Sequence, residues 1–358
     1  MQARLKRLRE QVIVITGASS GIGLVTAREA ARRGAKVVAV ARNGEALEAL
    51  CKEIEQGGGQ ASHVVADVGV EGDVRRIGQE AVARFGRIDT WVNDAGVSTY
   101  GKITDVPLED QRRIFETNYW GVVHGSLVAV EHMRQAGGAL INVGSQLSDH
   151  GIPLQGPYCA SKHAVKGFTD SLRMELDIDQ APISVTLIKP AAIDSAFIAH
   201  AGNRMDVEPR LPPPLYAPES VAEAILRAAE TPMRDVFVGA VSKLASVSAR
   251  TMPGAFHKLT TGLMYRLQRG DGPNTNPPTG SLFQHRQDLN ERGSAKGAPV
   301  FERSLYTKAS TGLADVGGAV LAVGLGMAAI AAVTVMRPAR GLQGPRFPRL
   351  PRLPRSPR

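Results

Sequence analysis

Seven short runs of β-branched and apolar residues recur along the chain, and stretches with helical periodicity separate them. The runs cover residues 12–15, 36–40, 63–66, 90–93, 139–143, 183–188 and 235–238. Regular alternation of strands and helices is typical of a parallel sheet whose strands are joined by right-handed helical crossovers. The nearly continuous Val and Ile indicate strands buried on both faces. We therefore predict an α/β fold over residues 1–240, with a doubly wound, seven-stranded parallel sheet and helices on both of its faces.

The strand-helix rhythm stops near residue 240, and three different segments follow. Residues 241–269 have apolar positions at helical spacing and predict a helical extension of one or two helices. Residues 270–310 are predicted to be a linker, since most of this stretch, up to residue 298, is rich in Gly, Pro, Asn, Ser and charged side chains. We expect no packed structure in that stretch.

The segment 311–336 contains 21 consecutive residues without a charge, 316–336, which is about the length that spans a bilayer. Its many Ala and Gly residues also suit a helix or hairpin that docks on the protein. Residues 337–358 repeat Pro and Arg and predict an extended basic tail that binds anionic lipid or stays solvated. A single span would move this tail away from the cytoplasmic side that Arg residues favour. A re-entrant segment, an interfacial helix and a true span therefore stay open.

Charge and cysteine content exclude several classes of protein. The net charge is +9, but seven Arg belong to residues 337–358, so the other 336 residues carry only +2. A basic groove for nucleic acid across the main domain is not expected. The two cysteines, Cys51 and Cys159, stand in no ligand spacing, so we predict neither a metal site nor a disulfide. The N-terminus lacks the pattern of a secretion signal, and we predict a cytoplasmic main domain associated with a membrane.

A glycine-rich segment follows the first predicted strand and precedes a helical pattern. It reads Thr-Gly-Ala-Ser-Ser-Gly-Ile-Gly at 16–23. In this setting the first glycine allows a tight turn, the second lets a pyrophosphate approach the backbone, and the third permits close packing of helix on sheet. Free N–H groups at the helix N-terminus favour an anion. The predicted phosphate-binding residues are Gly17, Ser19, Ser20, Gly21, Ile22 and Gly23.

Side chains at the ends of the next strands indicate which dinucleotide is bound. Arg42 follows the second strand, at the distance where an acidic residue binds the ribose hydroxyl of NAD. No acid is present there, and a guanidinium suits the 2′-phosphate of NADP, so NADP is predicted and NAD is less favoured. Arg32 and Arg33 are nearby candidates for the same role. Further contacts to the adenosine half are predicted at the ends of the third and fourth strands, from Asp67, Val68, Asn93, Ala95 and Gly96.

A tyrosine and a lysine on one helical face supply the predicted chemistry. Tyr158 and Lys162 are four residues apart and so project from the same side of a helix. An ammonium group near a phenol favours the phenolate and lowers the phenol pKa from about 10, which suits a proton donor. Ser145 follows the fifth strand and is predicted to hold the substrate oxygen. Asn118, within a long predicted helix over 108–133, is predicted to interrupt that helix and to anchor a water that links Lys162 to solvent.

These elements together resemble the short-chain dehydrogenase/reductase family with its single Rossmann core. The resemblance covers about residues 10–240 and rests on TGASSGIG at 16–23, NDAG at 93–96, Asn118, Ser145 and YCASK at 158–162. It implies that Tyr158 is the general acid/base and that Lys162 binds the nicotinamide ribose. It also implies a homo-oligomer, usually a dimer or tetramer. Two positions depart from the family pattern, Asp94 in place of Asn and Ala191 in place of Gly. Further cofactor contacts are implied at Pro190, Ile193 and Ser195.

The function predicted from the sequence is NADP(H)-dependent interconversion of a carbonyl and an alcohol. Residues 196–218 are rich in Pro and apolar side chains, where the family carries a substrate lid, so a lipophilic substrate is favoured. Packing of that segment onto the fold is the alternative. A non-catalytic, membrane-anchored nucleotide-sensing or scaffold protein on the same fold is the second functional hypothesis.

Overall fold

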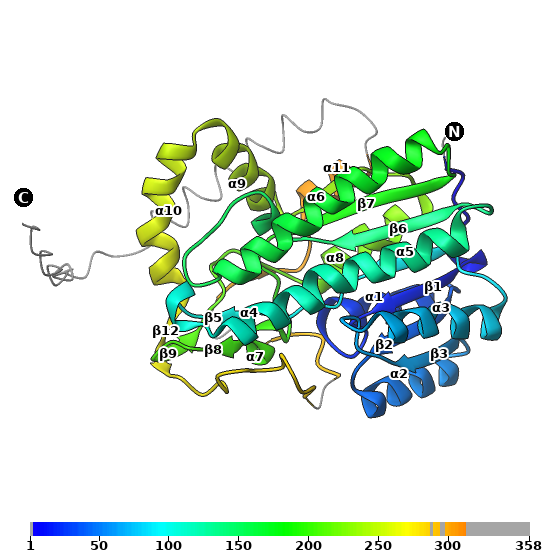
Figure 1. Cartoon of the computed structure of the whole chain (residues 1–358), viewed down its shortest axis with the longest axis horizontal. Coiled ribbons are helices and arrows are strands. Elements are labelled where there is room, and N and C mark those ends of the chain that lie inside the picture. The colour runs from blue at the N-terminus through cyan, green and yellow to red at the C-terminus, as the bar shows by residue number, and fades with distance from the viewer. Residues whose placement is uncertain (1–2, 287–288, 294–297, 313–358) are drawn as a thin grey trace, which may run out of the picture.

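A seven-stranded parallel sheet forms the centre of the computed structural model, which describes residues 3–286, 289–293 and 298–312 (Figure 1). The strand order is β11-β7-β6-β4-β1-β2-β3. The doubly wound α/β fold predicted from the sequence is confirmed. In chain order the strands are β1 (Val12–Thr16), β2 (Lys36–Ala41), β3 (Gln60–Val65), β4 (Thr90–Asn93), β6 (Gly138–Val143), β7 (Ile183–Pro190) and β11 (Asp235–Val238).

Burial on both faces of the sheet explains the nearly unbroken Val and Ile runs. In β1, Ile13 and Ile15 belong to one core cluster, whereas Val12 and Val14 belong to another on the opposite face. All four side chains are at most 2% exposed. Since neighbouring side chains in a strand point to opposite faces, a strand covered by helices on both sides must be apolar at every position.

Six main helices cover the two faces of the sheet (Figure 1). The first core cluster joins the sheet to α1 (Gly21–Arg32), α2 (Gly44–Gln56) and α8 (Pro218–Glu230). The second joins it to α3 (Glu71–Phe85), α5 (Gly121–Met133) and α6 (Gly156–Ile178). Proline stands in the first turn of α6 and of α8. The backbone N–H groups of a first turn have no partner within the helix, so the N–H that proline lacks is not needed there.

The long helix predicted over 108–133 is interrupted at Asn118. The structure has α4 (Leu108–Phe115), a π-helical turn over Glu116–Trp120 and then α5. A π-helical turn holds one extra residue and shifts the side chains that follow it. The predicted interruption at Asn118 therefore occurs, in the form of a π turn.

The predicted helical extension consists of two helices, α9 (Ala240–Thr251) and α10 (Pro253–Leu267), which stand at one end of the molecule (Figure 1). Beyond them, β12 (Arg269–Pro273) pairs with β9 (Val207–Pro209), and β13 (Val300–Phe301) pairs with β10 (Leu215–Tyr216). α11 (Leu305–Gly312) packs near β11 and α8. The shorter elements include β5 (Thr99–Tyr100), which pairs with β8 (Gly202–Asn203), and helix α7 (Phe197–His200).

Residues 270–286 and 289–293 do not form the unpacked linker that the sequence predicts. Ser281 and Leu282 are buried, and the segment returns across the main domain. The prediction is wrong because the backbone polar groups of this stretch find partners that are distant in the sequence. The uncharged segment 316–336 and the tail 337–358 lie outside the described residues. Among the residues that are described, no helix is long and apolar enough to cross a bilayer.

Candidate active site

A cavity of about 340 Å³ opens at the carboxyl ends of the parallel strands. The loops after β1, β2, β3, β4, β6 and β7 all contribute to its wall. It lies where the strand order changes direction, between β1 and β4. Crevices at this point of an open α/β sheet are the usual ligand sites of such folds, because the loops diverge there.

The glycine loop forms one end of the cavity. Gly17 has a φ of +78°, and a Cβ there would lie 3.0 Å from the backbone of Ala95. A Cβ on Gly23 would lie 2.3 Å from the carbonyl oxygen of Gly17, so only glycine lets α1 start so close to the loop. Gly21 faces Ser195 from the loop after β7. Gly17, Ser19, Ser20, Gly21 and Ile22 line the cavity, whereas Gly23 packs behind it.

The loop after β4 crosses the middle of the cavity and is tied to β1. The hydroxyl oxygen of Thr16 accepts hydrogen bonds from the backbone N–H groups of Asp94 and Ala95, at 3.1 and 3.2 Å. Asp94, Ala95 and Gly96 line the cavity. The Asn93 side chain instead joins a buried network between β4, β6 and α5, and its amide donates to Asn142 at 2.9 Å. Any contact from Asn93 to a ligand would therefore come from its backbone.

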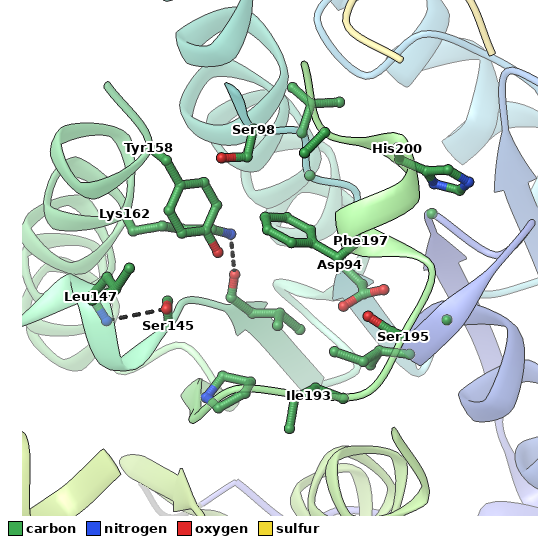
Figure 2. Close-up of a pocket in the computed structure, with 18 of the residues that line it drawn as sticks. Asp94, Ser98, Ser145, Leu147, Tyr158, Lys162, Ile193, Ser195, Phe197 and His200 are labelled. Atoms are coloured by element: carbon green, nitrogen blue, oxygen red, sulfur yellow. Dashed lines mark hydrogen bonds between the residues drawn. The ribbon is translucent and has the colours of Figure 1, made fainter. Parts of the chain in front are cut away.

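Three predicted catalytic side chains meet at the start of α6 (Figure 2). Lys162 and Tyr158 project from the same face of the helix, and the Lys162 nitrogen lies 5.7 Å from the centre of the Tyr158 ring. The Lys162 ammonium donates to the carbonyl of Val143 at 2.8 Å. Ser145 begins the turn after β6, where its hydroxyl accepts from the Leu147 N–H at 3.1 Å. All three side chains are less than 10% exposed.

The electrostatics of this group are dominated by burial. Burial lowers the pKa of Lys162 to about 8, and the charge of Asp94 opposes that shift. Burial also raises the pKa of Asp94 to about 7, against Lys162 and the backbone of Gly23. The pKa of Tyr158 lies well above its ordinary value because the phenol is buried, while a hydrogen bond from Ser145 acts in the opposite direction. The hydrogen bond from Ser145 thus favours the phenolate.

Asn118 is placed behind the catalytic group and does not line the cavity. Its amide oxygen accepts from the Val97 N–H at 2.8 Å, and its amide nitrogen donates to the Val97 carbonyl and to the Ser161 hydroxyl, both at 3.0 Å. Both donor hydrogens of the amide are thus used within the protein. The side chain fixes the loop after β4 to α6, which leaves little hydrogen-bonding capacity for the water predicted there.

The two side chains predicted at the adenosine end line the cavity but already have protein partners. Arg42 donates through both terminal nitrogens to the carbonyls of Ser281 and Leu282. Asp67 forms an ion pair with Arg113 of α4. The Asp67 carboxylate is therefore not free in the way the sequence analysis expects. Val68 lines the same end of the cavity.

A segment that the sequence analysis missed covers this end of the cavity. We call residues 274–293 the strap; residues 287–288 within it are not described. Leu282 is fully buried against Val97 and Ile114. The Asn43 amide donates to the Arg286 carbonyl, and the Gly21 N–H donates to the Asn290 carbonyl, both at 2.9 Å. The strap is thus held by the same loops that carry the predicted dinucleotide contacts.

The strap also holds the segment after β7. The Asn276 amide donates to the Ile198 carbonyl at 2.8 Å, and the Ser281 N–H donates to the His200 carbonyl at 2.7 Å. Both acceptors belong to α7, which carries Phe197. The Phe197 ring packs edge-on against Tyr158 with ring centres 5.5 Å apart (Figure 2). Pro190, Ile193 and Ser195, predicted to contact the cofactor, line the cavity just before this helix.

The other half of the cavity is mostly apolar. Its wall includes Leu147, Ile152, Phe197, Val241, Phe256 and Met264. Phe197 stood in the predicted lid, but Phe256 and Met264 come from α10, whose role the sequence left unassigned. No sequence motif marks these two residues, since the apolar face of a helix has the same pattern whether it packs on a core or lines a cavity.

The cavity wall has the features of a dinucleotide site. A glycine loop with a helix N-terminus lies at one end, the loops after β2 and β3 lie beside it, and a buried lysine with unused donors lies at the other. The fold and the site together define a nucleotide-binding α/β protein with a phenol, a lysine and a serine hydroxyl beside the cleft.

Comparison with known proteins identifies the family. A profile described as short chain dehydrogenase matches residues 11–206. An uncharacterized oxidoreductase of Bacillus subtilis, YxnA, is 48% identical over 310 residues, 86% of this chain and 87% of that protein. Dehydrogenase/reductase SDR family member 7B of Bos taurus is 33% identical over 70% of this chain and 81% of its own length. The chain belongs to the short-chain dehydrogenase/reductase family of oxidoreductases.

Solved structures agree on the fold. A short-chain type dehydrogenase/reductase from Mycobacterium marinum is 28% identical, with a TM-score of 0.57 over 65% of this chain and 95% of that one. An alcohol dehydrogenase from the archaeon Thermococcus sibiricus, complexed with 5-hydroxy-NADP, has the same TM-score at 24% identity and covers 63% of this chain and 95% of its own.

Proposed function

We propose that this protein is an NADP(H)-dependent oxidoreductase that interconverts a carbonyl and an alcohol on a lipophilic substrate, with Tyr158 as the acid/base. One observation carries the proposal. Tyr158, Lys162 and Ser145 meet in a cavity that runs without interruption from the glycine loop to an apolar chamber. A hydride donor and a carbonyl compound fit side by side in such a space.

A bound nicotinamide supplies the hydride in reduction and accepts it in oxidation. The Ser145 hydroxyl orients the substrate oxygen, and the Tyr158 phenol donates its proton to that oxygen as negative charge develops on it. The Lys162 ammonium, held by the Val143 carbonyl, stabilises the phenolate that remains and has donors left for the cofactor ribose. Burial keeps these groups away from bulk water, which strengthens each interaction.

Three features support NADP over NAD. Arg42 lines the adenosine end, and no acidic residue replaces it at the end of β2. Its guanidinium has an Nε–H, and further N–H groups, beyond those that bind the strap. The Thermococcus sibiricus enzyme binds an NADP derivative. A 2′-phosphate placed near Arg42 would thus gain a charge-assisted hydrogen bond.

A lipophilic substrate is supported by the apolar chamber between Phe197 and α10. One relative, described as 11-beta-hydroxysteroid dehydrogenase-like 4A from Arabidopsis thaliana, is 36% identical over 53% of this chain and 63% of its own length. Its description names an apolar alcohol class and agrees with the shape of the chamber.

Tyr158→Phe tests the acid/base assignment. Loss of the phenolic proton removes general acid catalysis, which contributes about 10²–10⁴-fold to the rate. We expect kcat for NADPH-dependent reduction of a panel of lipophilic ketones to fall by that factor, with NADPH affinity unchanged by nicotinamide fluorescence. Tyr119→Phe, a tyrosine outside the cavity, is the matched control. NADPH binding by the wild type without turnover of any ketone would favour a nucleotide-sensing protein instead.

A further inference from the structure

Two polar side chains in the apolar chamber lack hydrogen-bond partners. Both ring nitrogens of His150 and the amide oxygen of Gln146 are buried, and none of the three atoms has a partner in hydrogen-bonding geometry within the described part of the chain. Both residues line the cavity. They follow β6 in the same segment as Ser145. One short segment therefore carries Ser145 and the two residues with unpaired polar atoms.

The His150 ring packs against an aromatic side chain, and its titratable neighbours are Asp149 and His163. The ring lies edge-on against Phe256 of α10, with ring centres 4.9 Å apart. The nearest acid along the chain, Asp149, is already engaged by Lys189 at 3.2 Å and by the Ser246 hydroxyl at 2.6 Å. A buried polar group without a partner costs about 1–3 kcal/mol, so such groups in a cavity wall indicate a ligand that completes them.

The charge state of His150 limits what that ligand group can be. Burial lowers the pKa of His150, and the backbone of Gly151 and the Asp149 carboxylate oppose this shift only in part. The ring is therefore neutral at physiological pH and offers one donor and one acceptor. A neutral oxygen group such as a hydroxyl or ketone matches this pair, whereas a carboxylate would lack a cation.

We propose that His150, together with Gln146, binds a second, neutral oxygen group of the substrate at a distance from the carbon that exchanges the hydride. This inference rests on the proposed function and narrows its substrate class. The substrate is an apolar alcohol or ketone that carries a further hydroxyl or keto group on the part of its skeleton that reaches α10. A hydrocarbon chain without that group would leave both polar side chains unsatisfied.

Paired substrates test this assignment. A series of methyl ketones of increasing chain length is compared with ketones of the same lengths that carry a terminal hydroxyl group, with NADPH as donor. When the chain is long enough to reach His150, we expect kcat/KM for the hydroxylated ketone to exceed that of the plain ketone of the same length by about tenfold or more. The difference should arise mainly from a lower KM, because the hydroxyl group gives a buried polar side chain its hydrogen bond. His150→Phe keeps the ring contact with Phe256 and should abolish this preference.

Two further variants separate recognition from structural damage. His150→Gln retains a donor and an acceptor and should keep part of the preference. His63→Phe alters an exposed histidine of β3, outside the cavity, and should keep all of it. Equal kcat/KM for both series at every length, or a preference that survives in His150→Phe, would overturn the inference and leave the proposed function intact. Absence of turnover with every ketone would overturn both.

Discussion

Burial shifts the pKa values of Asp94 and Lys162 inside the cavity, and the charge of each group opposes the shift of the other. Most of the wall around them is uncharged, so the pKa of Asp94 rises to about 7 and that of Lys162 falls to about 8. Asp94 is also the residue that departs from the family pattern NNAG. An aspartate there gives the site an ionisable group that an asparagine would not provide.

Asp94→Asn should flatten the pH dependence of stability. The pKa of Asp94 is about 7 in the folded protein, whereas an exposed aspartate has a pKa of 3.8. The folded state therefore holds the proton more tightly, and the free energy of unfolding falls as pH rises from 3.8 to about 7. Because asparagine does not titrate, Asp94→Asn should raise the free energy of unfolding by on the order of 1–3 kcal/mol near pH 8 and by much less near pH 4. Urea denaturation of the cofactor-free protein at both pH values measures it; an equal change at both would contradict the assignment.

Arg42→Gln tests whether that side chain selects the cofactor or only holds the strap. A charge-assisted hydrogen bond to the 2′-phosphate contributes about 1.5–3 kcal/mol, so we expect NADPH affinity to fall roughly tenfold or more while NADH affinity changes little. Titration of nicotinamide fluorescence with both cofactors gives the two dissociation constants. An equal loss for NADPH and NADH would mean that Arg42 acts through the strap alone.

At the scale of elements, the strap closes the adenosine end of the cleft. It binds the loops after β1 and β2 through Gly21, Arg42 and Asn43, and it binds α7 on the other side. α7 in turn places Phe197 against Tyr158. A change in the strap would therefore reach both the loops after β1 and β2 and the helix that packs against Tyr158.

Leu282→Ala should loosen the strap. Removal of a fully buried leucine side chain costs about 2–5 kcal/mol where the site cannot collapse, and here that cost falls on the packing against Val97 and Ile114. We expect NADPH to bind about tenfold more weakly in a fluorescence titration. Phe283→Ala, at a neighbour that is 44% exposed, is the matched control and should bind normally. Tighter binding in Leu282→Ala would show that the strap obstructs the cofactor.

At the scale of the whole molecule, we propose that the uncharged residues 316–336 attach the protein to a membrane, which the sequence alone supports. The full chain should sediment with membranes, whereas a chain ending at residue 312 should stay in the supernatant and still bind NADPH. A second truncation, after residue 336, removes only the Arg tail and separates its electrostatic contribution from that of the uncharged segment. Sedimentation of all three chains alike would contradict the proposal.

Much of the core architecture follows from local patterns. Each strand of the main sheet was found within a few residues of its prediction, because apolar runs bounded by turns and helices identify buried strands without further information. The group that we propose to be catalytic could also be placed from the sequence. Tyr158 and Lys162 lie one helical turn apart, and the ends of parallel strands meet at one edge, so Ser145 and the glycine loop had to be near them.

What the sequence by itself determined is therefore the sheet, its two covered faces and the group at the start of α6. The tertiary structure decided the rest, because it depends on pairs of residues far apart in the chain. Arg42 and Leu282 are 240 positions apart, yet the Arg42 guanidinium donates a hydrogen bond to the Leu282 carbonyl. This contact helps to hold the strap against the cavity. Phe256 meets His150 in the same way, through helix packing that no local period encodes.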